Sequence, residues 1–217
     1  MLGAELLDHT RKDVLRDSAW PYLWSDDLIY TRLNEAQILF CRKTHALRDN
    51  TSSFTQITTE IGVNEYALDP TVLGISSASI SGQVHDMHDK TRTYVPSNLL
   101  TSTGLPTVYT TDEATHTLRL YPVPNAVYTV LMRVARKPLV PISDTTSPEI
   151  PEEYHLDLVE YAAYRCLRGN DPDGSNAKAA EEYNKTWSQR LSLAKNEYYK
   201  FRHGANPTVV NNWTGKR

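Results

Sequence analysis

Two histidines are the residues whose type and spacing come closest to a chemical site. They lie three residues apart, in the stretch Val84-His85-Asp86-Met87-His88. Imidazole nitrogens are common zinc ligands, and two of them at this spacing share one face of a helix. The flanking residues predict strand or turn, in which His85 and His88 point to opposite faces, so chelation needs a special geometry. We therefore expect a structural or surface role, with a metal-dependent hydrolase as an alternative that metal analysis tests.

Other signatures of catalysis are missing from the sequence. Its glycines form neither a nucleotide-binding phosphate loop nor the nucleophile elbow of a hydrolase. Two carboxylate pairs, Asp26-Asp27 and Glu152-Glu153, stand at expected helix starts, where the positive end of the helix dipole favours acidic side chains. The sequence therefore predicts a protein that is not an enzyme, with no catalytic residue, no cofactor and no bound metal.

The last residues form a basic segment in a chain that is mildly acidic as a whole. The sequence has 23 basic and 26 acidic side chains and a formal net charge of −3, which argues against sequence-specific DNA binding. Residues 200–217 contain Lys200, Arg202, Lys216 and Arg217 and no acid. Such an arm can contact phosphates or an acidic protein surface, and it is equally compatible with a solvated tail.

A length of 217 residues suits one domain, or one domain with a large insertion, that folds without disulfides or metals. Cys41 and Cys166 lie on separate helical patterns and are expected to be buried free thiols in a reducing compartment. The longest apolar runs, such as Tyr128–Met132, are far too short to span a membrane. Charged residues directly follow Met1–Leu7, so no signal peptide is expected.

The two flanks of the chain have helical periodicity. A first helix is expected over about Gly3–Arg16, with Leu7 and Val14 on its apolar face and its charges on the other. The apolar elbow Trp20–Trp24 is expected to pack onto a helix pair. Ser25 can cap a second helix, whose apolar stripe contains Ile29, Leu33, Ala36, Phe40, Thr44 and Leu47.

The C-terminal flank predicts two further helices and an arm. Pro151 suits the first turn of a helix that ends near Gly169, and residues 170–175 read as a polar turn. A long last helix is expected over about Asn176–Phe201, followed by the arm Arg202–Arg217. The stripe of the earlier helix is Leu156, Val159, Ala163 and Cys166, and that of the last is Ala180, Tyr183, Trp187, Leu191, Ala194, Tyr198 and Phe201.

The middle of the chain predicts short strands, because most of the 12 prolines fall between Pro70 and Pro151. Apolar and polar residues alternate over Thr117–Tyr121 and over Tyr128–Ala135, and residues 122–126 are expected to join these two runs as an antiparallel hairpin. Weaker strand candidates are Phe54–Thr59, Tyr66–Leu68, Val72–Ile80, Gln83–His88, Arg92–Val95 and Thr107–Thr111.

These elements predict an α+β fold in which a β-domain is inserted into a helical bundle. Residues 1–49 and 151–201 are expected to form the bundle, and residues 50–150 an antiparallel β-sandwich or barrel. Residues 202–217 are expected to be an extended C-terminal arm.

Three short sequence motifs, in their order along the chain, resemble those of the head-to-tail adaptor (connector) proteins of tailed bacteriophages, including the tail tubular A-type proteins of short-tailed phages. Together they cover most of residues 20–200, and the resemblance implies a helical bundle with a β-domain inserted between its second and third helices. The first motif is Asp27–Ala36 (DLIYTRLNEA). The second is Leu118–Pro124 (LRLYPVP), which precedes the strand Tyr128–Arg136. The third is Ile150–Tyr154 (IPEEY), followed by a helix with Tyr161–Tyr164 (YAAY) and a long helix with Tyr183 and Trp187.

The resemblance implies a structural part of the virion neck, made in the cytoplasm of the host bacterium. Such adaptors form a ring, usually of twelve copies, that joins the portal protein to a tail or nozzle protein and in some phages to a tail fibre. The ring continues the channel for genomic DNA without sequence-specific binding. In several relatives a C-terminal arm reaches the portal. The matching positions here are Arg202, Trp213 as an apolar anchor, and Lys216 and Arg217 as charge contacts.

Two other functions are compatible with these patterns. One is a different virion part, a tail terminator or tail-tube protein, although such proteins are mostly β and the helical flanks count against it. The other is a β-module that binds a carbohydrate on the host surface.

A ring also needs aromatic side chains at its interfaces. The candidates here either lie on the surface or fill the core of the helical bundle: Trp20, Tyr22, Trp24, Tyr30, Tyr154, Tyr161, Tyr164, Tyr198 and Tyr199.

Overall fold

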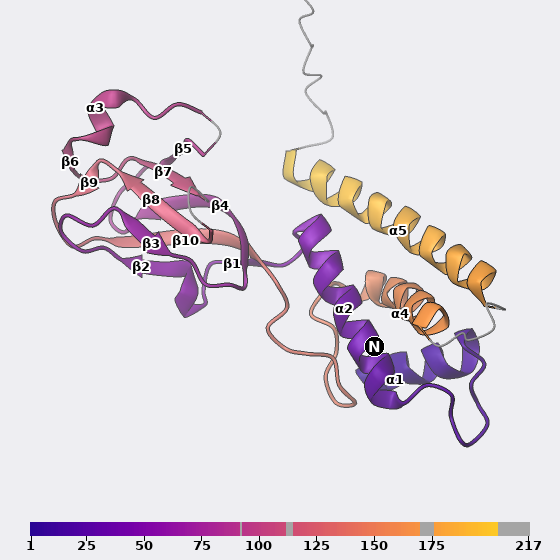
Figure 1. The fold of residues 1–217 in the computed structure, drawn as a ribbon. Coiled ribbons are helices and arrows are strands. Elements are labelled where there is room, and N and C mark those ends of the chain that lie inside the picture. Colours follow the sequence, from indigo (N-terminus) through magenta and orange to yellow (C-terminus); the bar gives the residue numbers. More distant parts are fainter. Residues whose placement is uncertain (92, 112–114, 170–175, 204–217) are drawn as a thin grey trace, which may run out of the picture. The chain divides into compact units, whose positions relative to one another are not determined.

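The computed structural model describes residues 1–91, 93–111, 115–169 and 176–203. The chain divides into two compact units (Figure 1). Met1–Ala46 and Val140–Arg217 form one of them, called the helical unit here, and Leu47–Leu139 form the other, called the β-unit. The fold is therefore α+β, with a helical part and a part built from sheets.

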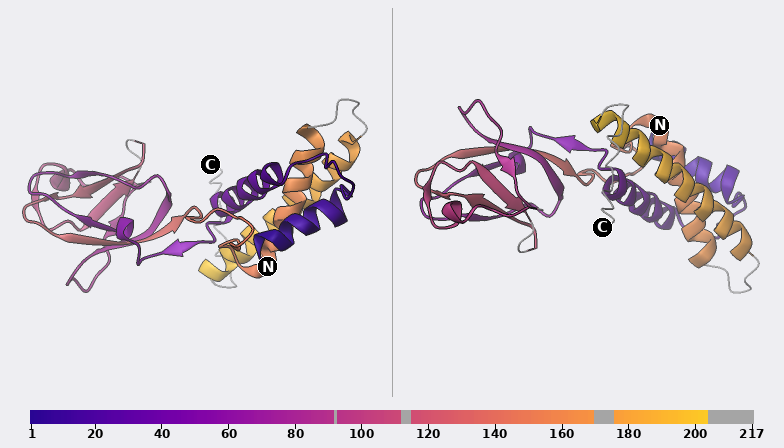
Figure 2. Two further views of the ribbon diagram at one scale, coloured as in Figure 1. Left: turned by 90° about the horizontal axis from the view of Figure 1, so that it is seen from below. Right: turned by 90° about the horizontal axis from the view of Figure 1, so that it is seen from above.

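The helical unit contains four main helical segments and a short 3₁₀ turn among the residues described. The segment α4 packs against both α2 and α5, and the views in Figures 1 and 2 show α4 and α5 side by side. The bounds are α1 (Gly3–Asp8) continued by the π-helical η1 (His9–Val14), α2 (Asp26–Thr44), the 3₁₀ turn η3 (Glu152–Tyr154), α4 (His155–Gly169) and α5 (Ala177–His203).

The helix α2 follows the sequence prediction closely. The Ser25 hydroxyl oxygen accepts a hydrogen bond from the Leu28 backbone N–H at 3.3 Å, which satisfies one of the free donors of the first turn. The helix ends where His45 adopts a left-handed conformation with a φ of 53°. The buried side chains of the predicted stripe are Ile29, Leu33, Ala36, Phe40 and Thr44.

Two helical stripes differ from the prediction. The first helix buries Leu6, Thr10 and Arg11 in place of the expected apolar pair, because its second half is π-helical and the wider turn changes which residues share a face. In α4, Val159, Ala163 and Cys166 are buried as expected, but Leu156 is exposed.

The β-unit consists of short strands in three sheets. In one sheet β10 pairs with β1, β2 and β4, all antiparallel, and a second sheet has the order β3-β8-β7-β5. A two-stranded parallel sheet joins β6 to β9. The bounds are β1 (Arg48–Asp49), the 3₁₀ turn η2 (Ser53–Thr55), β2 (Gln56–Thr58), β3 (Glu65–Ala67), β4 (Val72–Ile80), β5 (His88–Asp89), the helical turn α3 (Ser97–Leu100), β6 (Thr103–Gly104), β7 (Val108–Thr111), β8 (Thr117–Tyr121), β9 (Val123–Pro124) and β10 (Thr129–Arg136).

Both four-stranded sheets contribute side chains to one core. Leu118 and Leu120 from β8 and Val130, Met132 and Val134 from β10 belong to the same buried cluster. Alternation along both strands is therefore confirmed, as is a β part built on short sheets. Within the described residues these sheets remain separate, so the unit is not one closed barrel.

The predicted hairpin between residues 117–121 and 128–135 is wrong. The strand β8 pairs with β3 and β7, whereas β10 belongs to the other four-stranded sheet. The connection between them is itself paired, because β9 runs parallel to β6 and the Val123 N–H bonds to the Ser102 carbonyl. This pairing carries the chain from one sheet to the other and leaves no tight turn to form a hairpin.

Other strand candidates are confirmed unevenly. The range Val72–Ile80 matches β4, and Phe54–Thr59, Tyr66–Leu68 and Thr107–Thr111 overlap β2, β3 and β7. Of Gln83–His88, only His88 enters a strand, and residues 93–95 lie outside the strands that the structure defines.

The returning segment 140–150 packs with the helices, whereas the proline pattern groups it with the strands. The Asn34 side chain donates to the Ile142 carbonyl at 3.0 Å and accepts from the Ile142 N–H at 2.7 Å. The Gln37 side-chain oxygen accepts from the Glu149 N–H at 2.8 Å. Side-chain amides of α2 thus hold an irregular segment in the helical unit, a pairing that the sequence pattern does not reveal.

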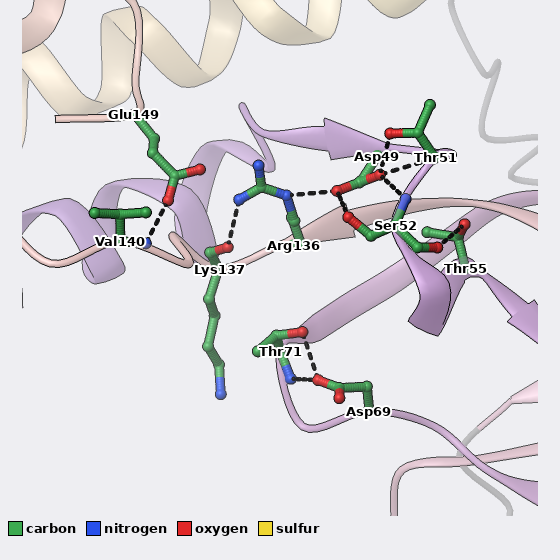
Figure 3. Close-up of polar contacts among 10 residues, drawn as sticks. All are labelled: Asp49, Thr51, Ser52, Thr55, Asp69, Thr71, Arg136, Lys137, Val140 and Glu149. Atoms are coloured by element: carbon green, nitrogen blue, oxygen red, sulfur yellow. Dashed lines mark hydrogen bonds and ion pairs between the residues drawn. The ribbon is translucent and has the colours of Figure 1, made fainter. Parts of the chain in front are cut away.

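A buried ion pair ties the first strand of the β-unit to its last (Figure 3). The Asp49 carboxylate, on β1, accepts from Arg136 Nε on β10 at 2.9 Å, and the two side chains are 7% and 14% exposed. It also accepts from the Ser52 and Thr51 backbone N–H groups and from the Ser52 hydroxyl. Burial alone raises the pKa of Asp49, but these hydrogen bonds outweigh it and hold the pKa well below its ordinary value.

We predict that Asp49→Asn destabilises the β-unit by about 2–3 kcal/mol, because it breaks a buried ion pair. Hydrogen exchange at the β10 amides measures this loss. A carboxyl with a lowered pKa stabilises the fold above its unfolded pKa and loses that effect as the pH falls through its folded pKa. The difference in free energy of unfolding between Asp49→Asn and wild type should therefore be largest at neutral pH and become smaller below about pH 4.

The four tryptophans provide an internal control, because none lies within residues 47–139. The buried Trp24 and Trp187 make their fluorescence sensitive to unfolding of the helical unit, so the midpoint of that transition should not move in the variant. Asp86→Asn, an exposed change in the same unit, should leave exchange at β10 unaltered. Equal protection in Asp49→Asn and wild type at pH 7 would show that the pair does not hold the two strands.

Candidate functional site

The connection between η1 and α2 presents apolar side chains to solvent. Trp20 is 84% exposed, Leu23 is 59% exposed and Tyr22 is 43% exposed. We call residues 17–25 the aromatic loop. The loop borders a pocket of about 560 Å³ whose lining includes Trp20, Leu23 and Asp26. Several large apolar side chains together on a surface are typical of a site that binds another protein.

A buried arginine fixes the backbone of this loop. The Arg11 side chain, 4% exposed, donates through Nη1 to the Asp17 carboxylate at 2.8 Å and through Nη2 to the Trp24 carbonyl at 2.7 Å. It also pairs with Asp26 at the start of α2. The Asp17 carboxylate in turn accepts from the Leu23 N–H at 3.0 Å and the Trp24 N–H at 3.1 Å. The loop is therefore held at both of its ends by one charged network.

The aromatic residues of the loop point in different directions. Trp24 is buried, and its indole N–H donates to the Cys166 carbonyl of α4 at 3.1 Å. The Arg11 guanidinium lies 4.1 Å from the centre of the Tyr22 ring, and the Trp20 ring meets that of Tyr22 edge to face at 5.6 Å. The elbow was expected to pack onto the helices as a whole, but of its five residues only Trp24 is buried. The remaining aromatic surface is held in place but uncovered.

A second pocket lies between α4 and α5. It has a volume of about 370 Å³ and is lined by Tyr164, Leu167, Arg168, Ala177, Ala180, Glu181 and Asn184. Arg168 Nη1 donates to the Tyr164 hydroxyl at 2.5 Å, and the guanidinium lies 5.8 Å from the centre of that ring. We call this the Tyr–Arg pocket. Tyrosine and arginine are enriched at the centres of protein interfaces.

The aromatic side chains named as interface candidates divide between surface and interior. Trp24 and Tyr161 are buried, whereas Trp20, Tyr22 and Tyr199 are exposed. Half-buried side chains make up the rest, namely Tyr30, Tyr154, Tyr164 and Tyr198. Both interpretations of these residues, core and surface, therefore apply to different members of the set.

The two histidines lie in the β-unit beside a pocket of about 620 Å³. His85 precedes β5 and His88 lies in it, both are exposed, and Asp86 and Met87 also line this pocket. In the part of the chain that the structure describes, no group of three or more histidine, cysteine, aspartate or glutamate residues could hold a metal ion. The geometry brings the pair to one pocket, but among the described residues it does not arrange three side chains there as metal ligands.

The two cysteines are buried, which limits the reactivity of their thiols. Cys41 and Cys166 are both buried thiols that form no disulfide, as expected. Burial raises the pKa of the Cys166 thiol to about 11, so that little thiolate is present at neutral pH. A buried protonated thiol is a poor nucleophile and a poor metal ligand, which leaves a packing role for this residue.

The proposed arm lies almost wholly outside the described residues. The helix α5 runs to His203, so Arg202 belongs to this helix and not to an extended segment. Trp213, Lys216 and Arg217 lie beyond the described range, as does the polar turn at 170–175. None of the helices that the structure describes is long and apolar enough to span a membrane.

Comparison with family models identifies the family of this chain. The family model described as SU10 adaptor protein matches residues 1–209, a range that includes the β-unit and every described element of the helical unit. No curated protein matches the chain.

We predict that Arg11→Met destabilises the helical unit by about 3 kcal/mol and frees the aromatic loop, because methionine keeps much of the packing but donates no hydrogen bond. The slow hydrogen exchange expected for the Leu23 and Trp24 amides should then be lost.

Trp20→Ala is the matched control, since that side chain is mostly exposed and its removal should leave stability within about 0.5 kcal/mol of wild type. Unchanged protection of the Leu23 and Trp24 amides in Arg11→Met would contradict a loop held by the arginine.

Proposed function

Since the chain belongs to the SU10 adaptor protein family, a family of structural phage adaptors, we propose that it joins the portal to the tail in the virion neck. Membership makes the protein a virion component and a structural part, not an enzyme. The observation that carries the proposal is the extent of the match, which spans 1–209 and so takes in both units. The proposal adds the position in the neck, the ring and the partners.

In this proposal the protein acts as a ring, of twelve copies as in the head-to-tail adaptors that it resembles. Each copy in a ring needs two different surfaces, one for each neighbour. The helical unit offers two that share no residue: the aromatic loop and the Tyr–Arg pocket. The aromatic loop exposes Trp20 and Tyr22, and the pocket is lined by Tyr164 and Arg168, all of residue types that are enriched at interfaces.

The two units divide the work in this proposal. The helical unit, together with residues 204–217, binds the portal protein, and Trp213, Lys216 and Arg217 are the contacts that the resemblance suggests. The β-unit has a core of its own and faces the next layer, a tail or nozzle protein and in some phages a tail fibre. A separate core allows each unit to keep its structure while it binds a different partner.

The channel through the ring carries genomic DNA past the protein. A formal charge of −3 on each copy adds up around the ring and disfavours adhesion of the phosphate backbone. The protein is accordingly expected to let DNA pass without sequence-specific binding.

Co-sedimentation with purified portal rings tests this function. Full-length protein should pellet with the portal, and a chain that ends at His203 should bind at least about tenfold more weakly if the last segment contributes an apolar anchor and two charges. In light scattering without the portal, the protein should be a monomer.

The matched control keeps the full length of the chain and changes the three side chains together: Trp213→Ala, Lys216→Glu and Arg217→Glu. It should bind the portal as weakly as the shortened chain if these side chains, and not chain length, make the contact. Undiminished binding by both would remove the C-terminal segment from the proposal. No binding by the wild-type protein would remove the portal as its partner.

A further inference from the structure

The aromatic loop is preorganised, because contacts within its own chain fix its conformation. Its backbone is fixed by Arg11 and Asp17, both with side chains less than a tenth exposed. Trp20 nevertheless stands 84% exposed. An apolar side chain held in one position loses little conformational freedom on binding, so its burial contributes nearly in full to affinity. Such a loop is suited to insertion into a pocket on a partner.

The Tyr–Arg pocket has the dimensions and chemistry to receive this residue. Its volume of about 370 Å³ gives room for an indole ring, and two apolar residues of its lining, Leu167 and Ala180, are themselves buried. Tyr164 can pack against an aromatic ring, and the Arg168 guanidinium can lie over its face.

Acidic side chains border the aromatic loop, whereas the lining of the Tyr–Arg pocket contains one basic and one acidic side chain, Arg168 and Glu181. Asp26 lines the pocket next to Trp20, and its neighbour Asp27 is exposed at the start of α2. Arg168 is exposed, and it is the basic side chain of that lining that Asp27 of another copy can face. A pairing of these surfaces therefore brings unlike charges together around a shared apolar contact.

We propose that the aromatic loop of one copy inserts Trp20 into the Tyr–Arg pocket of the next copy. This inference rests on the proposed function, because it names the contact between neighbours in the ring. The loop and the pocket use different residues, so the contact is heterologous and can continue from copy to copy. One inserted side chain is a small contact, which we expect to form a ring only when the portal brings the copies together.

Both halves of the contact are present on this chain, which favours a second copy over another partner. The portal is the other possible occupant of the aromatic loop. The experiments below separate these two cases.

Disulfide trapping between copies tests the contact directly. Trp20→Cys and Ala177→Cys replace exposed residues, one on the loop and one in the pocket lining. The two variants are mixed, assembled on portal rings and oxidised. A disulfide-linked dimer should form in the mixture and not in either variant alone. The native cysteines Cys41 and Cys166 are buried and should not react.

Leu193→Cys is the matched control, because Leu193 is also exposed on α5 but does not line the pocket. Mixed with Trp20→Cys it should give no dimer. Equal cross-linking of Trp20→Cys to Leu193→Cys and to Ala177→Cys would overturn the proposed contact.

A charge exchange tests the same contact without cross-linking. Asp27→Lys and Arg168→Glu should each weaken ring formation on the portal by about tenfold, and the double variant should recover most of this loss. Circular dichroism melting of each variant checks that the fold is kept. Two single losses with no recovery in the double variant would count against pairing of these surfaces.

The outcomes separate the contact from the function. Portal binding without a Trp20–Ala177 cross-link overturns the inference and leaves the proposed function standing. Trp20→Cys can also be tested against a portal that carries surface cysteines. A cross-link to this portal, and not to a second copy, assigns the loop to the portal and overturns the inferred contact between copies. Absence of portal binding by the wild-type protein removes both.

Discussion

The buried guanidinium of Arg11 must find acceptors inside the helical unit, because a desolvated charge without partners costs several kcal/mol. Those acceptors come from residues of the following loop, Asp17 and the Trp24 carbonyl, and from Asp26. To satisfy the arginine, the loop has to take one conformation. In that conformation Trp24 turns inward against α4 while Trp20 turns outward. An electrostatic requirement in the interior therefore determines which apolar side chain is displayed on the surface.

The β-unit shows the same principle at the point where the chain enters and leaves it. Asp49 lies on the first strand and Arg136 on the last, and their ion pair fastens two antiparallel strands that are far apart in the sequence (Figure 3). An inserted unit needs its two ends close together, and a charged clamp there adds a geometric constraint to the apolar core. Family membership connects these features to a structural role in a phage particle.

Local signals were sufficient to predict some elements and not others. The Ser25 cap and the 3.6-residue stripe through Phe40 predict α2, and alternation of apolar residues predicts β8 and β10, because each of these signals lies within the element itself. Strand pairing depends on residues far apart in the chain, so the sequence placed β8 and β10 in a hairpin although they belong to different sheets. Arg11 looked like one more charge on a solvated face, since its acceptors lie in a loop without periodicity. The exposed Trp20 was foreseen as a candidate interface residue, but its support and its pocket were not.

The most direct test of the account is a cryo-electron microscopy reconstruction of the neck of the phage particle that carries this protein. We expect copies of the chain in a closed ring between portal and tail, with the helical unit against the portal and the β-unit toward the tail. A particle whose neck lacks this chain, or in which the chain lies on the capsid surface or at the tail tip, would contradict it.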